Sequence, residues 1–228
     1  MQRNCASKMN LYFISGLAAD ERMFERLQFP AHITPVFLPW LKPLKEESLH
    51  SYVHRMAESI DSTKPFVLMG LSFGGIVCCE LNTFLKPQKT ILLSSVCSHK
   101  HFPPWFGWVR KYHLENKLSA KTIKATPTGI NNYLFGASSP AGKALLADTI
   151  KRCDDELLLW SIKQIINWNF SEPVSNLVLI HGSSDKIFPL RYLHPQHIIK
   201  NGEHLAVFEN AGAASSILSQ ILYQHHYV

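Results

Sequence analysis

The segment at residues 65–74 constrains the fold of this chain more than any other stretch. Residues 65–69, Pro-Phe-Val-Leu-Met, are apolar and predict a buried strand, and residues 70–74 read Gly-Leu-Ser-Phe-Gly. This G-x-S-x-G pattern is typical of a strand that turns sharply into a helix with the serine, Ser72, at the apex. The backbone at the apex of such a turn is strained. At the positions two residues to either side, a Cβ would collide with the neighbouring strand or helix, so glycine is needed there. The pattern therefore predicts a serine whose hydroxyl is free to act as a nucleophile.

Residues 70–74 have a simpler interpretation, which is a glycine-rich start of a helix with an ordinary N-terminal serine. The flanking residues argue against it. Residues 75–81, Gly-Ile-Val-Cys-Cys-Glu-Leu, are apolar enough for a helix buried under a sheet, so strand, serine and helix follow in the required order. We expect Ser72 to be the catalytic nucleophile of an enzyme.

A nucleophilic serine needs a base, and the base needs an acid that orients it. Asp185 follows an apolar strand at residues 177–182, at the sheet edge where open parallel sheets place their chemistry. His204 follows a weak strand at residues 197–200 and a turn at residues 201–203. The order is therefore serine, acid and base, each at the end of a strand, which predicts Asp185 as the acid and His204 as the base.

Other residues compete for these two roles, because the chain has twelve histidines. His194 precedes a proline in a connecting loop, and His197 opens a strand, where its ring would point into a sheet face. Asp154 and Asp155 are alternative acids, but they are typical of the solvated start of a helix. Glu203, beside the expected base, is interpreted as a surface residue.

The tetrahedral intermediate of such chemistry needs two backbone N–H groups aimed at its oxyanion. Phe73, directly after the expected nucleophile, supplies one. The loop at residues 15–20, after an apolar strand at residues 10–14, is expected to supply the other. In that loop Gly16 allows the backbone to approach closely, and Leu17 is the expected donor.

Together these segments resemble the α/β-hydrolase family, specifically its small single-domain esterase-like members. The residues that carry the resemblance are 15–17, 70–75, 181–189 and 202–204, which occur in the family's order and span nearly the whole chain. The resemblance implies Ser72 as nucleophile, Asp185 as acid, His204 as base, and Leu17 with Phe73 as oxyanion donors.

The chain departs from the family pattern in two ways. It has Ser15 before Gly16 where many members have His-Gly, which affects the shape of the oxyanion loop but not its backbone donor. It also begins at what would be the family's third strand, which leaves about six strands.

Strands and helices are expected to alternate up to residue 95, as in a parallel sheet with helices on both faces. The expected strands are 10–15, 33–38, 65–70 and 89–95, and the expected helices are 20–28 (with Asp20 as its cap), 48–61 and 73–85. Residues 96–176 contain no clear strand and are too long for one crossover helix. We expect an α/β fold, a mainly parallel sheet of about six strands flanked by helices, in one domain at residues 1–228 with a small helical cap inserted at roughly 98–170.

The cap is expected to contain two amphipathic helices, near residues 141–151 and 154–167, and an aromatic entry at residues 101–108. Trp105, Phe106 and Trp108 are candidates for lining an apolar acyl pocket. The alternative is plain packing of the cap against the core, and the sequence does not decide between the two.

Composition excludes several classes of protein. No run of eighteen apolar residues predicts a membrane span, and residues 1–10 lack the apolar core of a secretory signal. Five cysteines without a C-x-x-C motif favour a reduced, cytoplasmic setting. The histidines show no metal-ligand spacing, so no metal and no cofactor are expected. The net charge of +6 is modest, and no basic block with interleaved aromatics indicates nucleic-acid binding.

The sequence thus predicts a serine hydrolase that cleaves a small-molecule carboxylic ester or thioester with a small or medium acyl group. Two alternatives remain open. The same scaffold supports C–C bond hydrolysis, lyase and perhydrolase chemistry, and a binding protein could retain the three residues without catalysis. The oligomeric state is not predicted.

Overall fold

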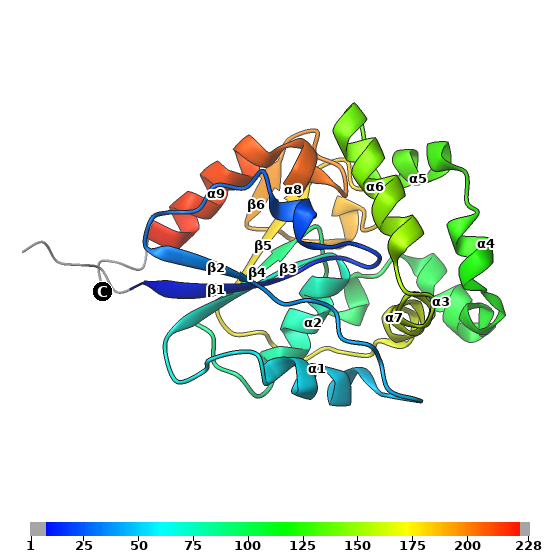
Figure 1. Ribbon diagram of the computed structural model, residues 1–228, viewed down its shortest axis with the longest axis horizontal. Coiled ribbons are helices and arrows are strands. Elements are labelled where there is room, and N and C mark those ends of the chain that lie inside the picture. The colour runs from blue at the N-terminus through cyan, green and yellow to red at the C-terminus, as the bar shows by residue number, and fades with distance from the viewer. Residues whose placement is uncertain (1–7, 224–228) are drawn as a thin grey trace, which may run out of the picture.

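The computed structural model describes residues 8–223 (Figure 1), and its centre is one sheet of six parallel strands. The strand order across the sheet is β2-β1-β3-β4-β5-β6. The strands are β1 (Met9–Ile14), β2 (Ile33–Phe37), β3 (Phe66–Leu71), β4 (Lys89–Leu93), β5 (Leu177–Gly182) and β6 (His197–Ile199). The expected α/β architecture with about six parallel strands is confirmed.

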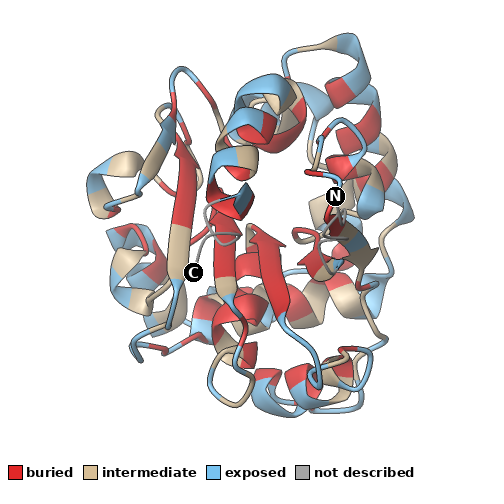
Figure 2. Ribbon diagram, turned by 90° about the vertical axis from the view of Figure 1, so that its left-hand side faces the viewer, coloured by how far each residue is buried: buried red, intermediate tan, exposed pale blue. Residues whose placement is uncertain are grey.

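Helices cover both faces of the sheet. On one face lie α1 (Leu49–Ala57) and α2 (Phe73–Leu81), and on the other lie α8 (Ala206–Glu209) and α9 (Ala211–Tyr223) (Figure 1). Each face has its own apolar core, and all six residues of β3 are buried between the two cores. Figure 2 shows this buried centre as red strands inside a partly exposed shell of helices. A strand buried on both faces reads as a continuous apolar run, which is why β3 was recognisable from its residues.

The helix α1 illustrates how the sequence specifies these covers. Ser48 precedes it and accepts a hydrogen bond from the backbone N–H of Ser51, which satisfies one of the free donors at the helix start. The buried residues of α1 follow at helical spacing and form one apolar face: Leu49, Tyr52, Val53 and Met56.

Three expected helices differ from the structure. Residues 20–28 form only a 3-10 helix, η1 (Glu21–Phe24), because the backbone makes i to i+3 bonds such as Leu27 N to Phe24 O (2.9 Å). Asp20 caps η1 as expected, accepting from Arg22 N. The helix expected at 48–61 ends at Ala57, and the one expected at 73–85 ends at Leu81.

Between β4 and β5 the described chain contains only helices, and we refer to residues 98–170 as the cap segment. Two of its helices, α6 (Pro140–Arg152) and α7 (Asp155–Asn167), match the two expected ones within a residue. The other helices of the cap segment were not predicted individually: η2 (His99–His101), α3 (Pro104–Lys111), η3 (Leu114–Lys117), α4 (Ala120–Lys124) and α5 (Thr128–Phe135). Figure 1 shows α3 to α7 gathered beyond the carboxyl ends of the strands.

The turn from β3 into α2 is packed too tightly for any side chain at Gly70 or Gly74. A Cβ on Gly70 would lie 2.3 Å from the carbonyl carbon of Gly74, and a Cβ on Gly74 would lie 2.3 Å from Ile14 O. The second contact joins the turn to the end of β1. These glycines therefore fix the height at which Ser72 stands above the sheet.

Replacing Gly74 by alanine is expected to destabilise the protein by more than about 4 kcal/mol, because the new methyl group meets backbone atoms that cannot move away. Gly107→Ala in α3 is the matched control, since a Cβ there has no neighbour within 4 Å and alanine is the better helix former. Urea unfolding followed by circular dichroism measures both. Equal stability of the two variants would contradict the packing described here.

Candidate active site

Ser72 occupies the turn between β3 and α2 in a conformation that few non-glycine residues adopt. Its φ is 52° and its ψ is −116°. Hydrogen bonds hold this backbone in place: Ser72 N donates to Leu93 O (2.9 Å), and the hydroxyl of Ser95 donates to Ser72 O (2.6 Å). Strain of this kind persists only where the surroundings enforce it, and here it lifts the serine hydroxyl toward the cap segment.

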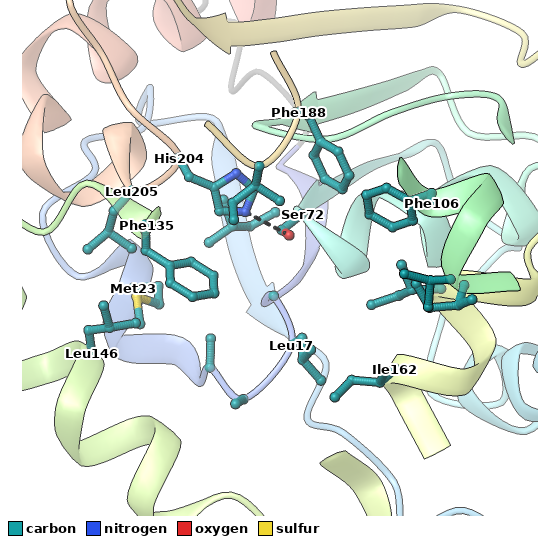
Figure 3. Close-up of a pocket in the computed structure, with 18 of the residues that line it drawn as sticks. Leu17, Met23, Ser72, Phe106, Phe135, Leu146, Ile162, Phe188, His204 and Leu205 are labelled. Carbon is teal, nitrogen blue, oxygen red and sulfur yellow. Dashed lines mark hydrogen bonds between the residues drawn. The ribbon is translucent and has the colours of Figure 1, made fainter. Parts of the chain in front are cut away.

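The structure brings Ser72, His204 and Asp185 into one line of hydrogen bonds. The ring nitrogen Nε2 of His204 lies 2.9 Å from Ser72 Oγ (Figure 3). The other ring nitrogen, Nδ1, lies 2.8 Å from Asp185 Oδ2. Because the carboxylate only accepts, Nδ1 carries the hydrogen of that bond, which leaves Nε2 free to accept from the serine hydroxyl. This is the geometry required of a serine nucleophile, its base and an orienting acid.

Close backbone packing brings the loops of Asp185 and His204 together. Gly182 at the end of β5 lies so near Gly202 that an added Cβ would be 2.3 Å from Gly202 O. The backbone N–H of Ser184 also donates to Gly202 O (2.8 Å). The turn that precedes His204 is therefore pinned to the strand end that precedes Asp185.

Asp185 is buried, and its carboxylate has several donors. Oδ1 accepts from the backbone N–H groups of Ile187 (2.8 Å) and Phe188 (2.9 Å). Burial by itself raises the pKa of the carboxyl, but the combined attraction of His204 and His181 outweighs it and holds the pKa of Asp185 well below its ordinary value. Asp185 is therefore ionised at neutral pH.

His181 belongs to the site although no role was predicted for it. It is fully buried in β5, and its Nε2 lies 2.8 Å from Phe188 O and 3.3 Å from Asp185 Oδ2. Since a carbonyl can only accept, Nε2 carries a hydrogen and points it at both oxygens. A histidine inside an otherwise apolar strand, four residues before the acid, was the signal available in the sequence.

Two aromatic rings enclose the imidazole of His204. The rings of Phe135 and Phe188 approach it edge-on, with centroids 5.7 Å and 5.6 Å away. Leu205 N also donates to Phe135 O (2.9 Å), which ties the histidine loop to the end of α5. These contacts leave His204 only 3% exposed and restrict its ring to the orientation that reaches both partners.

The two expected oxyanion donors flank Ser72. Phe73 is the first residue of α2, so its backbone N–H has no partner within that helix. Leu17 lines the cavity beside Ser72, and its N–H makes no hydrogen bond to any residue of the described range 8–223. Both N–H groups are thus available to a ligand at Ser72.

Trp40 contacts both halves of this arrangement. Its indole Nε1–H donates to Gly16 O (3.2 Å), which belongs to the same peptide group as the N–H of Leu17. Its ring stacks on the ring of Phe73 at a centroid distance of 5.1 Å. Nothing in the local sequence marked Trp40, because the contact is made between elements far apart in the chain.

An apolar cavity of about 310 Å³ lies directly over Ser72 and His204 (Figure 3). Its walls come from the loop after β1, the cap segment and the loop after β5, and include Leu17, Phe106, Phe135, Ile162 and Phe188. Apart from His204, no side chain of the lining is ionisable. The cavity therefore favours an uncharged, apolar group next to the serine.

Of the three aromatic residues that were candidates for lining the pocket, two lie at the cavity and one does not. Trp105 and Phe106 both line the cavity. Trp108 is not part of the lining, and its side chain is 67% exposed on the outer face of α3. Phe106 and Trp108, two positions apart, point to different sides of α3. Trp105 lies between these two sides, because it lines the cavity and is still 50% exposed.

The structure keeps the competing residues away from the serine. Asp154 caps α7 by accepting from Leu157 N, and Asp155 pairs with Lys124. Glu203 pairs with Lys186. His194 and His197 make no contact with Ser72 in the described part of the chain.

The described residues contain no group of three or more His, Cys, Asp or Glu side chains arranged to hold a metal ion. None of the helices in residues 8–223 is long and apolar enough to cross a membrane.

Comparison with solved structures identifies the architecture. The lip1 protein of Acinetobacter baumannii AYE, named as a candidate lipase, superposes with a TM-score of 0.67 at 17% identity, covering 95% of this chain and 84% of that one. An esterase from Thermogutta terrifontis gives 0.66 at 15% identity, covering 97% and 92%. BpoC of Mycobacterium tuberculosis H37Rv, named as a candidate non-heme bromoperoxidase, gives 0.67 at 14% identity, covering 96% and 93%.

This chain has the α/β-hydrolase fold. No family sequence model matches the chain, and no curated protein matches it by sequence. The likeness is therefore one of fold, at identities too low to transfer an activity.

The lowered pKa of Asp185 predicts how the stability of the protein depends on pH. A carboxylate with a folded-state pKa below its unfolded value of about 3.9 stabilises the fold fully above that value, and the contribution is lost as the pH falls toward the folded-state pKa. We expect Asp185→Asn to lower the free energy of unfolding by about 3 kcal/mol at pH 7, and the difference from the natural protein to narrow below about pH 4.

Denaturant unfolding at several pH values between 7 and 3 measures this difference. Asp155→Asn is the control, because its exposed ion pair with Lys124 contributes less than about 1 kcal/mol. A difference for Asp185→Asn that stays constant from pH 7 to pH 3 would rule out the electrostatic role given to this carboxylate.

Proposed function

We propose that this protein is a serine hydrolase that cleaves a carboxylic ester or thioester with an apolar acyl group of small or medium size. The observation that carries the proposal is the unbroken line from Ser72 through His204 to Asp185, at the floor of an apolar cavity. The hydrolase, esterase and lipase names among proteins of the same fold agree with it.

The chemistry follows from the hydrogen bonds. Ser72 Oγ attacks the carbonyl carbon of the substrate while Nε2 of His204 takes the hydroxyl proton. Asp185 accepts from Nδ1 and stabilises the imidazolium that forms. When the tetrahedral intermediate collapses, the bond to the leaving group breaks and His204 returns the proton to the departing alcohol or thiol. Water then attacks the acyl-enzyme by the same route and releases the acid.

The negative charge of each tetrahedral intermediate would rest on the N–H groups of Leu17 and Phe73. Phe73 N–H lies at the start of α2, where the helix dipole adds a partial positive charge. Trp40 and Ala19 both donate to Gly16 O, which fixes the peptide that carries the N–H of Leu17. Donors that are oriented before the reaction stabilise a developing charge at little cost in reorganisation.

We further propose that the chain works as a single domain in which residues 98–170 act as a cap. Trp105 and Phe106 from α3 and Ile162 from α7 supply much of the apolar wall. Such a wall excludes water and would bind the hydrocarbon part of the substrate. Since the lining offers no basic side chain other than His204, a substrate with a second, free carboxylate is disfavoured.

We expect Ser72→Ala to lower kcat on p-nitrophenyl esters by at least about 1,000-fold while the fold remains intact, because the nucleophile is removed and no packing contact is lost. His204→Ala should lose a comparable factor. A panel of p-nitrophenyl esters and acyl-thioesters of increasing chain length measures both variants and reports the acyl preference of the natural protein.

Matched controls for these variants lie on the surface. Ser59→Ala and His194→Ala alter exposed residues outside the cavity and should keep the activity of the natural protein. An unchanged rate for Ser72→Ala, or a loss for His194→Ala equal to that for His204→Ala, would defeat the proposed mechanism.

Trp40→Phe tests the oxyanion loop separately. The substitution removes the Nε1–H donor to Gly16 O but keeps a ring to stack on Phe73, so it should lower kcat about three- to tenfold and leave KM nearly unchanged. Trp160→Phe is the control, because it also removes an indole donor, in this case to Glu47 O. Equal effects of the two substitutions on kcat would argue against a specific role for Trp40.

A further inference from the structure

The outer surface of the cap segment carries an unusual concentration of exposed apolar side chains. Eleven large hydrophobic residues are exposed in the described range 8–223, and eight of them lie between residues 105 and 134. Five of them come from one part of the chain, namely α3, η3 and the residues at their ends, and we call them the α3 face: Trp105, Trp108, Tyr112, Leu114 and Leu118. Clusters of this kind on a folded surface indicate an interaction site.

The helix α3 has two distinct sides. Phe106 is buried and stacks on Phe102, and the guanidinium of Arg110 donates to Ile166 O and Trp168 O at the end of α7. Trp108 and Tyr112, four residues apart, point away from those contacts and lie 67% and 53% exposed. The inner side therefore anchors α3 to the protein, and the outer side has no partner in the described chain.

The charge of the protein is concentrated in the same region. Residues 98–135 contain six Lys or Arg residues and a single acidic residue, Glu115, a net charge of +5 against +6 for the whole chain. Glu115 is buried. Arg110 and Lys124 are engaged in internal contacts, but Lys111, Lys117 and Lys121 are exposed without an ion pair among the described residues. These three lysines flank the exposed aromatic and leucine side chains.

The α3 face also borders the cavity above Ser72. Trp105 and Leu118 line that cavity and are at the same time 50% and 40% exposed to solvent. In Figure 1, α3 and α4 form the outer limit of the molecule on the side of the cap segment. A surface that touched this face would lie next to the entrance used by an apolar substrate.

We propose that the α3 face docks onto an anionic lipid surface and takes substrate from it. This proposal rests on the proposed hydrolase function for its substrate, but not for the docking itself. Trp and Tyr rings prefer the boundary between headgroups and acyl chains, and lysines beside them attract anionic headgroups. A protein partner fits less well, because lysine is depleted in protein interfaces.

Vesicle flotation tests the docking without relying on catalysis. The full chain carrying Ser72→Ala is mixed with vesicles of phosphatidylcholine alone or with one quarter phosphatidylglycerol. We expect binding to the anionic vesicles, at least about tenfold weaker binding to the neutral ones, and weaker binding at 0.5 M than at 0.1 M NaCl.

Two sets of substitutions separate the apolar and the charged contributions. Trp108→Ser with Tyr112→Ser, and Lys111→Gln with Lys117→Gln and Lys121→Gln, should each lower the vesicle partition coefficient at least about tenfold. Leu44→Ser with Lys45→Gln is the matched control on an exposed loop elsewhere and should bind as the unaltered protein does. None of these side chains lines the cavity. The same substitutions made in the protein with its natural Ser72 should therefore leave the turnover of soluble p-nitrophenyl butyrate unchanged.

Three results would overturn the docking proposal. One is a protein that does not float with anionic vesicles, and a second is equal loss of binding in the control variant. The third is a dimer in sedimentation equilibrium that Trp108→Ser with Tyr112→Ser converts to a monomer, which would assign the face to a second copy of the chain. If the natural protein bound anionic vesicles but hydrolysed no ester or thioester, the result would count against the hydrolase function alone and not against the docking.

Discussion

The backbone of Ser72 is the constraint on which the rest of the site depends. A φ of 52° in a serine is unfavourable by itself. It is maintained by the hydrogen bonds of the Ser72 backbone to Leu93 O and to the hydroxyl of Ser95. Gly70 and Gly74 allow the turn to close against itself and against the end of β1. The same contacts set where α2 begins, and so where the free N–H of Phe73 lies. A small relaxation of this turn would move the hydroxyl of Ser72, the N–H of Phe73 and the helix α2 together.

The other parts of the site reach Ser72 by way of the sheet. Parallel strands place their carboxyl ends at one edge, so β1, β3, β5 and β6 deliver their following loops to the same place. The loop at residues 15–20, the serine, the aspartate and the histidine each follow a different one of these strands. This arrangement explains how residues more than a hundred positions apart come within 2.9 Å. The cap segment then closes the remaining side with apolar residues.

The sequence carried enough information to predict the sheet and the line from Ser72 to Asp185, because both depend on local patterns. An apolar run followed by glycine or a turn marks a buried strand and its end, and Ser72, Asp185 and His204 lie in the turns and loops that follow such ends. The prediction was wrong or incomplete where the type and length of a helix depend on contacts between elements far apart in the sequence. The helix expected at residues 20–28 is a single 3-10 turn, and most of the cap helices were not resolved from their residues.

The position of single side chains at the site was also hard to predict from the local sequence. Trp105 and Trp108 are equivalent by composition, but only Trp105 turns into the cavity, since the packing of α3 on α7 decides which side faces inward. Trp40 donates a hydrogen bond to Gly16 O, and His181 Nε2 is bonded to Phe188 O and lies 3.3 Å from Asp185 Oδ2. The histidine in the apolar run before Asp185 was a local signal for His181, but nothing in the sequence near Trp40 or Gly16 indicates their contact.

The central claim is that the hydroxyl of Ser72 is activated by His204, and reaction with a fluorophosphonate probe followed by peptide mass spectrometry tests it most directly. The account predicts one probe per chain, attached to Ser72, and no attachment in His204→Ala on the same timescale. A protein that stays unlabelled, or that is labelled at another serine, would contradict the account and favour a binding protein that keeps three residues of a catalytic site without using them.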